Sequence, residues 1–518
     1  MSNDKIYSYH NFMFPFRFDK IIGEIEDRHS YYKYEIFDNR VKIDEDFKAQ
    51  LESDGWSYQK HIIGTNLDYN EFVYFHDFTR DTLFNTQEFG DGATSYYFDK
   101  SVDCSSSFTI KIKDNRSYYL SLVGVSLRVF DTGVAILSFE LENRDPQQSH
   151  IDDILKINDF GRRIYPQFLG RYSDKSEWTE ATKGAFLADE ISLCINGDRI
   201  IEKFNYTEIP KEIKIAKHII KILGENTFTT TKSEDGKNFI QPSVDDRMFV
   251  ICWYGDENLS QELKGYNYIS SDKWYKYIFI DNGDKTIQSP KMQERFIKEA
   301  TYDRWMDYKE GLTLFGMSRY SFVSLSNSSW FSKNILPLPH IRTMYYQMFT
   351  LLLAQRASIL RFSDEVTALS DISSRELKNN QISNLYKNYI RFVNKLYFRE
   401  ITPQDQGLEI YNQARGILKI DGDIKDLDKE IDELYQYAKM LEDNERTQKM
   451  DNLSKMGYMF LPPTLVAGLF GMNVFPEHFI DNICGLIISF GSIIGLTWWI
   501  GKINNINIKE FFIKKGTK

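Results

Sequence analysis

Cysteine is scarce in this 518-residue chain, and basic residues are fewer than acidic ones. The four cysteines lie far apart and form no Cys-x-x-Cys pair, a spacing that gives no zinc knuckle and is typical of reduced thiols in a cytoplasmic protein. The formal net charge is −10 and the pI is about 5.5. Because a general nucleic-acid binder needs a basic face, direct binding to DNA or RNA is not expected.

Motifs of the common enzyme classes are lacking as well. The sequence contains no Walker loop, no nucleophile elbow, no zinc-protease motif and no dinucleotide fingerprint, and its eight histidines are scattered. The amino terminus, MSNDKIYSYHNFMFPF, has no basic region followed by an uninterrupted apolar run, so no signal peptide is predicted. We therefore expect a protein that is not an enzyme.

Two uncharged runs lie close together near the carboxy terminus, at residues 456–474 (MGYMFLPPTLVAGLFGMNV) and 482–500 (NICGLIISFGSIIGLTWWI). Each run has about 19 residues, enough to cross a hydrocarbon core as a helix, and the short connection predicts an antiparallel pair. Lysine and arginine precede the first run and follow the second, whereas the connection between the runs carries Glu477 and Asp481 and neither lysine nor arginine. The sequence thus predicts a multi-pass protein of the cell (inner) membrane, in contact with membrane lipid, with both termini cytoplasmic. A plain membrane anchor is the alternative.

The first run ends in Gly471-Met472-Asn473, and Glu477 follows in a Pro-Glu pair. The stretch FLPPTLVAGLFGMNVFPE resembles the signature of the CorA family of magnesium channels, and the resemblance covers residues 340–502. It implies a homopentamer in which the first helix lines a pore for Mg²⁺. Because Mg²⁺ loses its water reluctantly, Asn473 amide oxygens would bind the hydrated ion.

Carried over position by position, the pore line of the family falls on further residues of this sequence, namely Thr464, Leu461, Gly457, Leu453 and Met450. In this interpretation Thr464 supplies a second polar ring, while Leu453 and Met450 form an apolar constriction. Ordinary helix packing explains any one of the apolar positions equally well. A zinc-exporting branch shares this topology, so the transported ion and its direction stay open.

Upstream of the runs, residues 402–455 are predicted to form a stalk helix. Thr402-Pro403 suits a helix start, and apolar residues recur every three or four positions from Ile417 to Leu441. Acidic residues crowd the other face, among them Asp421 and Asp423. They are either a solvated surface or, as in the family, a site for regulatory Mg²⁺.

The fold class that follows is an α+β cytoplasmic domain with a long stalk helix and two C-terminal transmembrane helices, a CorA-like funnel. The predicted parts are an enlarged sensor-like α+β domain (1–335), the helical part of the cytoplasmic domain (336–401), the stalk (402–455), the transmembrane hairpin (456–502) and a basic cytoplasmic tail (503–518). Within the first part, two apolar strands flank Asp131-Thr132-Gly133, and MFVICWY at 248–254 is a buried-strand pattern.

Three clusters in the first part combine arginine with aromatic residues. They contain the candidate ligand-binding residues Arg17, Arg162, Arg163, Tyr165, Arg319 and Tyr320. Arginine beside a ring suits phosphate binding with base stacking, although an aromatic core with a paired arginine is the more common arrangement.

Such clusters in an enlarged domain, next to a CorA-like signature, are similar to the CorA-like effectors associated with type III CRISPR systems. That resemblance implies a membrane effector of antiviral defence, gated by a small nucleotide messenger. The alternatives are a housekeeping magnesium uptake channel and a membrane-anchored sensor that conducts no ions.

Overall fold

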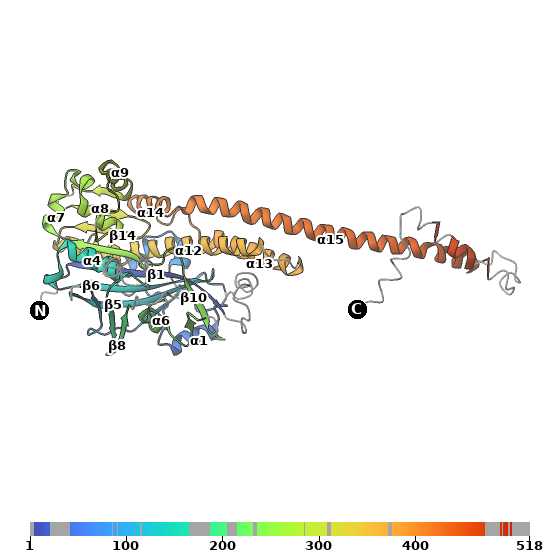
Figure 1. The fold of residues 1–518 in the computed structure, drawn as a ribbon, viewed down its shortest axis with the longest axis horizontal. Coiled ribbons are helices and arrows are strands. Elements are labelled where there is room, and N and C mark those ends of the chain that lie inside the picture. The colour runs from blue at the N-terminus through green and yellow to red at the C-terminus, as the bar shows by residue number, and fades with distance from the viewer. Residues whose placement is uncertain are drawn as a thin grey trace, which may run out of the picture. The chain divides into compact units, whose positions relative to one another are not determined.

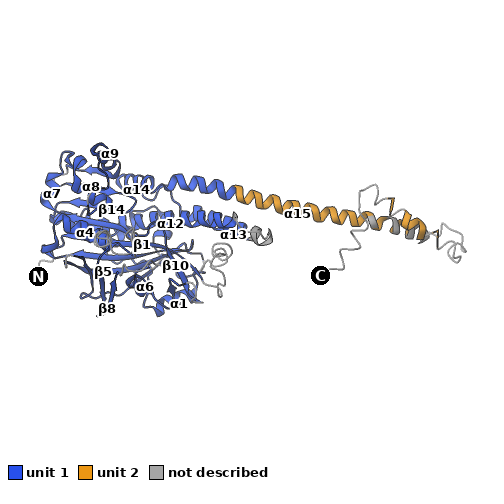
Figure 2. Cartoon of the chain, viewed as in Figure 1, with its two compact units in different colours: residues 1–432 blue, residues 433–518 orange. Residues whose placement is uncertain are grey.

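The computed structural model divides the chain into two compact units, residues 1–432 and 433–518 (Figures 1 and 2). It describes residues 5–20, 42–84, 86, 88–90, 92–113, 116–164, 187–204, 215–231, 236–283, 285–307, 312–370, 375–471, 487–488, 490–495 and 498–499. Every described strand belongs to the first unit, which is therefore the part that builds a sheet-based core.

The described strands join one mixed sheet in the order β12-β13-β14-β11-β1-β6-β5-β4-β7-β8, with β10 beside β1, β9 beside β10, β3 beside β5 and β2 beside β3. Their bounds are β1 (Ser8–Lys20), β2 (Ser57–Tyr58), β3 (Ser95–Lys100), β4 (Ser107–Lys111), β5 (Ser117–Phe130), β6 (Val134–Asn143), β7 (Glu190–Ile195), β8 (Asp198–Lys203), β9 (Phe228–Thr229), β10 (Asn238–Pro242), β11 (Phe249–Gly255), β12 (Thr301–Trp305), β13 (Thr313–Met317) and β14 (Ser321–Ser326).

Within the first unit, helices such as α12 on one side and α1 and α6 on another cover the sheet (Figure 1). Their bounds are α1 (Glu45–Ser53), α2 (Asn66–Val73), α3 (Asp77–Leu83), η1 (Pro146–Gln148), α4 (Ile151–Gly161), α6 (Lys217–Leu223), α7 (Glu257–Glu262), η2 (Asn267–Ser270), α8 (Asp272–Phe279), α9 (Pro290–Ala300), α10 (Trp330–Asn334), α11 (Leu338–Arg342), α12 (Met344–Ser370), α13 (Arg375–Lys395), α14 (Asp405–Ile417) and α15 (Ile420–Gly471).

Strands β5 and β6 confirm the predicted hairpin, and Gly133 in its turn has a φ of 77°, which a glycine adopts without strain. Side chains alternate between the two faces of a strand. On β5, Leu127 and Val129 enter the main hydrophobic core, whereas Ser126 and Arg128 hydrogen-bond to α12. At β5 the sheet therefore has an apolar face and a face whose polar groups bond to α12, and α12 also stacks Phe349 on Phe322 of β14.

Helix α12 lies in the region predicted to be helical, residues 336–401, and it lies across β1 and β6. Its residues are almost continuously buried from Met344 to Ile359. Helix α13 lies in the same region, with Ile382, Leu385 and Phe392 each at most 2 % exposed. The predicted buried strand at 248–254 is also confirmed, because β11 is buried along its whole length.

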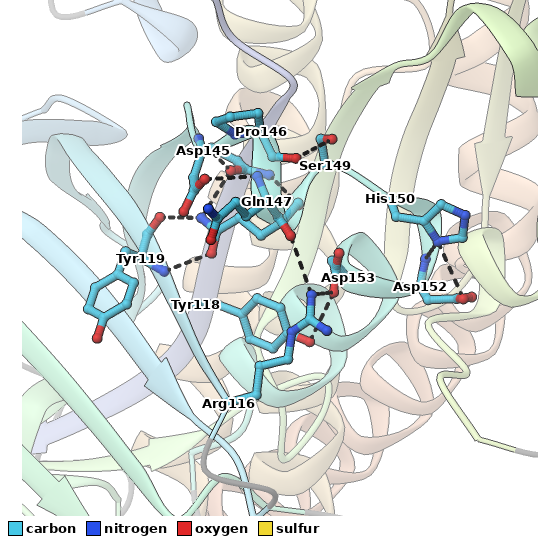
Figure 3. A network of polar contacts seen from close by, with 12 residues as sticks. Arg116, Tyr118, Tyr119, Asp145, Pro146, Gln147, Ser149, His150, Asp152 and Asp153 are labelled. Carbon is cyan, nitrogen blue, oxygen red and sulfur yellow. Dashed lines mark hydrogen bonds and ion pairs between the residues drawn. The ribbon is translucent and has the colours of Figure 1, made fainter.

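Helix α4 is held at its amino-terminal end by a network of polar contacts (Figure 3). Arg116 forms an ion pair with the buried Asp153 at 2.5 Å, and the Tyr118 hydroxyl donates to the same carboxylate at 3.3 Å. His150 caps the helix, since its Nδ1 accepts from the backbone N–H of Asp152 at 3.3 Å. These contacts attach α4 to β5 and so fix where its carboxy-terminal end lies.

The region predicted as one stalk helix is divided into α14 and α15. Thr402 is buried and donates its hydroxyl to the backbone carbonyl of Tyr74, so the predicted cap at 402 is wrong and α14 begins at Asp405. Lys419 separates the two helices with a left-handed φ of 57°. The predicted apolar seam is confirmed at the start of α15, where Ile420, Ile424, Leu427 and Ile431 are buried.

The prediction of two transmembrane helices is contradicted. Among the residues that the structure describes, no helix is both long and apolar enough to cross a membrane. The predicted fold class and the predicted location as a multi-pass inner-membrane protein are therefore wrong in this respect. Residues 472–486, 489, 496–497 and 500–518 of the predicted hairpin and tail lie outside the described residues.

Candidate functional site

Four of the predicted ligand-binding residues come together around one loop, residues 243–248, which connects β10 to β11. Arg17 on β1 lines a pocket with this loop. Arg163, just after α4, forms a β-bridge with Arg247 of the loop, and the carbonyl of Arg162 accepts from the N–H of Met248 at 2.8 Å. Tyr320, between β13 and β14, lies beneath the guanidinium of Arg247.

The loop lies where the sheet divides. On one edge of β1, Ser8–Met13 pair with β11, whereas Phe16–Lys20 pair with β10. Pro15 stands between the two halves, and proline has no N–H for a ladder hydrogen bond. Its carbonyl instead accepts from the N–H of Ser243 at 2.9 Å. The division leaves space between β10 and β11 that the loop occupies.

Two guanidinium groups approach the ring of Tyr320. The Cζ atom of Arg162 lies 5.5 Å from the ring centroid and that of Arg247 lies 4.9 Å from it, both within the range of a cation–π interaction. Asp159 of α4 balances part of the charge, since it accepts from Arg163 at 2.8 Å and lies 3.6 Å from the Arg162 guanidinium. The cluster therefore places two guanidinium cations over one aromatic ring.

Arg162 is only 2 % exposed, yet its Nε and Nη1 have no hydrogen-bond partner among the described residues. The pKa of its guanidinium is lowered to about 10, mainly by burial and in part by the nearby Arg247 and Arg163, against the opposing effect of Asp159. Unpaired buried donors are costly, and charge-assisted bonds to an anion would satisfy them. The unpaired donors of Arg162 therefore suit a phosphate or a carboxylate.

A pocket of about 440 Å³ adjoins the cluster on the side of Arg17. Arg17 Nε donates to Gln241 at 2.6 Å, and its guanidinium forms an ion pair with Asp364 of α12. The loop contributes Asp246, whose pKa is raised to about 6 by burial and by the adjacent Asp245. Residues of the sheet, the loop and α12 thus line this pocket together.

The remaining predicted ligand residues have different outcomes. Arg319 is exposed and, within the described part of the chain, takes no part in the cluster. Tyr165 lies outside the described residues. Sequence reasoning missed Arg247 and its neighbours Asp245 and Asp246; the signal was a run of three charges directly before a buried strand.

The predicted pore line follows one face of α15, because its members are three or four residues apart. The side chains of Met450, Leu453 and Leu461 are 64 %, 70 % and 55 % exposed, and the Thr464 hydroxyl donates to the carbonyl of Phe460 at 2.7 Å. Gly457 also lies in α15, and Gly471 is the last residue of this helix. Met472, Asn473 and Glu477 lie outside the described residues, so their role as a filter stays a prediction.

Two of the stalk acids are engaged in ion pairs at the start of α15. Asp423 pairs with Arg356 of α12, and Asp421 pairs with Arg415 of α14. In the described ranges, no group of three or more histidine, cysteine, aspartate or glutamate side chains is arranged to hold a metal ion.

One comparison with known proteins gives a match. Residues 340–502 match the family described as CorA-like Mg²⁺ transporter protein, so this part of the chain is a CorA-like domain. The matched range begins in α11 and includes α12 to α15 and Gly471-Met472-Asn473. Members of this family are divalent-cation transporters rather than enzymes, and they form homo-oligomers. No curated protein matches the chain.

Proposed function

We propose that this protein transports Mg²⁺ as a homo-oligomer, most simply a pentamer, and that its amino-terminal unit controls transport by binding a nucleotide. The observation that carries the proposal is the CorA-like match over residues 340–502, which includes the Gly-Met-Asn motif. In an assembly of several copies, the Asn473 amides would form a ring. Amide oxygens can accept hydrogen bonds from the water that Mg²⁺ retains.

Transport is tested by Mg²⁺ flux into lipid vesicles that contain the full chain, with Zn²⁺ and Ni²⁺ as competing ions. We expect Asn473→Ala to reduce Mg²⁺ flux at least tenfold, because the ring loses its oxygen ligands. Asn452→Ala, the same change on the exposed surface of α15, is the matched control and should transport normally. Absence of flux from the wild-type chain, or flux unchanged by Asn473→Ala, refutes the proposed transport route.

The nucleotide part of the proposal rests on the cluster at Tyr320. Arg162 offers unpaired buried donors for a phosphate, and a base that displaces the guanidinium of Arg247 would stack on the ring of Tyr320. Arg163, Arg247 and the pocket beside Arg17 extend the same site. A transporter controlled by a nucleotide would have the role attributed to the CorA-like effectors of type III CRISPR defence.

Nucleotide binding is tested by isothermal titration of the full chain with cyclic dinucleotides, nucleoside diphosphates and inorganic phosphate. Arg162→Gln should weaken binding at least tenfold, since hydrogen bonds between charged groups are the strong ones. Arg319→Gln removes an exposed arginine one residue from Tyr320 and is the matched control. Equal affinity of both variants and wild type would refute this site.

The flux assay also separates the alternatives. A housekeeping uptake channel would respond to Mg²⁺ on the side of the amino-terminal unit and not to any nucleotide. A sensor without conduction would bind nucleotide in the titration and carry no Mg²⁺ flux. The ion pairs that occupy Asp421 and Asp423 favour control by a nucleotide over control by Mg²⁺ at these two acids.

A further inference from the structure

Helix α12 touches both the candidate ligand pocket and the start of α15. On one side its Asp364 pairs with Arg17, and its Leu360 and Arg361 line the same pocket. Arg356, two helical turns before Asp364 in α12, pairs with Asp423 in the first turn of α15. One helix therefore carries the contacts at both places.

The contact between α12 and the sheet combines stacked aromatic rings, such as Phe349 on Phe322, with directional polar bonds. The Tyr346 hydroxyl bonds Ser126 at 3.0 Å, and Ser358 bonds Thr132 at 2.7 Å. Further along, Arg361 Nη1 donates to the carbonyl of Gly133 at 2.7 Å. Hydrogen bonds of this kind have defined geometry, so a helix held by them moves between discrete positions instead of sliding continuously.

The other side of α12 holds the base of α15. Arg356 is 7 % exposed, so its pairing with Asp423 is partly shielded from solvent and is stronger than a surface pair. Ile420 and Ile424 are buried in the same first turns. Directly before them, Lys419 takes a left-handed conformation that breaks the helix between α14 and α15. The change of direction at this break separates the base of α15 from α14, and the Arg415–Asp421 ion pair connects the two helices across it.

We propose that α12 transmits the state of the Arg17 pocket to the base of α15, and that the Arg356–Asp423 ion pair is the contact that transmits it. Only the biological purpose of this coupling rests on the proposed function. The coupling itself is argued from the contacts of α12 with the pocket and with α15. A change at Arg17 alters the pairing of Asp364, α12 adjusts, and the hold of Arg356 on Asp423 changes. The region that responds is residues 420–432, the part of α15 that belongs to the first unit.

The test is hydrogen–deuterium exchange of the full chain, read at peptides from residues 420–432. Arg17→Gln perturbs the pocket, and we expect it to raise amide exchange in these peptides about threefold or more. Asp364→Asn, which removes the other half of the pair, should do the same. In an Arg356→Gln background, exchange is already raised, and Arg17→Gln should add little to it.

Two further variants keep the result interpretable. The exchanged pair Arg356→Asp with Asp423→Arg should restore both low exchange and the response to Arg17→Gln. Lys273→Gln breaks an exposed ion pair with Glu262 and should leave residues 420–432 unchanged. If Arg17→Gln and Asp364→Asn leave these peptides unchanged, or if Arg17→Gln acts equally in the Arg356→Gln background, the coupling is refuted. Because neither flux nor nucleotide enters this assay, its failure is distinct from failure of the proposed function.

Discussion

The buried arginine Arg361 offers the sharpest test of how α12 is held on the sheet. Its guanidinium pairs with Asp19 at 2.7 Å and with Glu365 at 2.9 Å, and it donates to the carbonyl of Gly133 at 2.7 Å. The side chains of Arg361 and Glu365 are only 1 % and 2 % exposed. Replacement by methionine keeps much of the volume but leaves the Glu365 carboxylate buried without its cation. Breaking a buried pair in this way costs about 3–5 kcal/mol.

The assay is urea unfolding followed by tryptophan fluorescence, since Trp56, Trp253 and Trp274 are buried in the first unit. A loss of this size lowers the urea midpoint by the loss divided by the urea slope. For a unit of this size the slope exceeds the value of about 1–3 kcal/mol per M found for small proteins, so the shift is several tenths of 1 M. A second substitution, Glu365→Leu, removes the uncompensated charge, so the double variant should regain at least half of the loss.

Arg304→Met is the matched control, because Arg304 pairs with Glu409 at the surface, where both side chains are at least 40 % exposed. Its midpoint should equal that of the wild type. The reasoning is refuted if Arg361→Met unfolds within about 1 kcal/mol of the wild type, or if adding Glu365→Leu lowers stability further.

Three further variants test other parts of the first unit by thermal unfolding. Burial raises the pKa of Glu71 to about 7, so the folded state binds this proton more tightly than the unfolded state does. The stability of the wild type therefore falls as the pH rises from about 4.5 through 7. Glu71→Gln should reduce this fall, and the variant should melt at a higher temperature than the wild type at about pH 8. Gly161→Ala would place a methyl group 2.6 Å from the ring of Phe12 and should cost about 1–3 kcal/mol, seen as a lower melting temperature. His218 is fully buried, and its two ring nitrogens have no partner among the described residues. Burial lowers its pKa to about 3, so wild-type stability is lost as pH falls below about 6.5, and His218→Phe should gain more at pH 5 than at pH 8; an equal gain at both pH values would contradict this reasoning.

Local patterns predicted individual elements well. The hairpin of β5 and β6 follows from two apolar runs around Asp131-Thr132-Gly133, because a turn that needs a positive φ suits glycine. The strand β11 follows from a continuous apolar run. Each depends on neighbours along the chain, which are readable in one sequence.

The same reasoning failed where partners are distant in sequence. Thr402 was predicted as a helix cap, yet its hydroxyl is taken by the carbonyl of Tyr74, a residue far earlier in the chain. Apolar runs predicted two membrane helices, and the structure contradicts them among the residues it describes. The stalk acids Asp421 and Asp423 looked like a solvated face, but arginines from α14 and α12 bind them.

The sequence alone determined the CorA-like motif, the order of the carboxy-terminal helices and the strand hairpin, because all of these are set by residue identity and short spacing. Only the tertiary structure decided that Arg17, Arg162 and Tyr320 surround one loop. Their assembly depends on the division of the sheet at Pro15 and on the position of α4, which are products of long-range strand pairing. Such pairing joins segments hundreds of residues apart, and no local periodicity encodes which segments will meet.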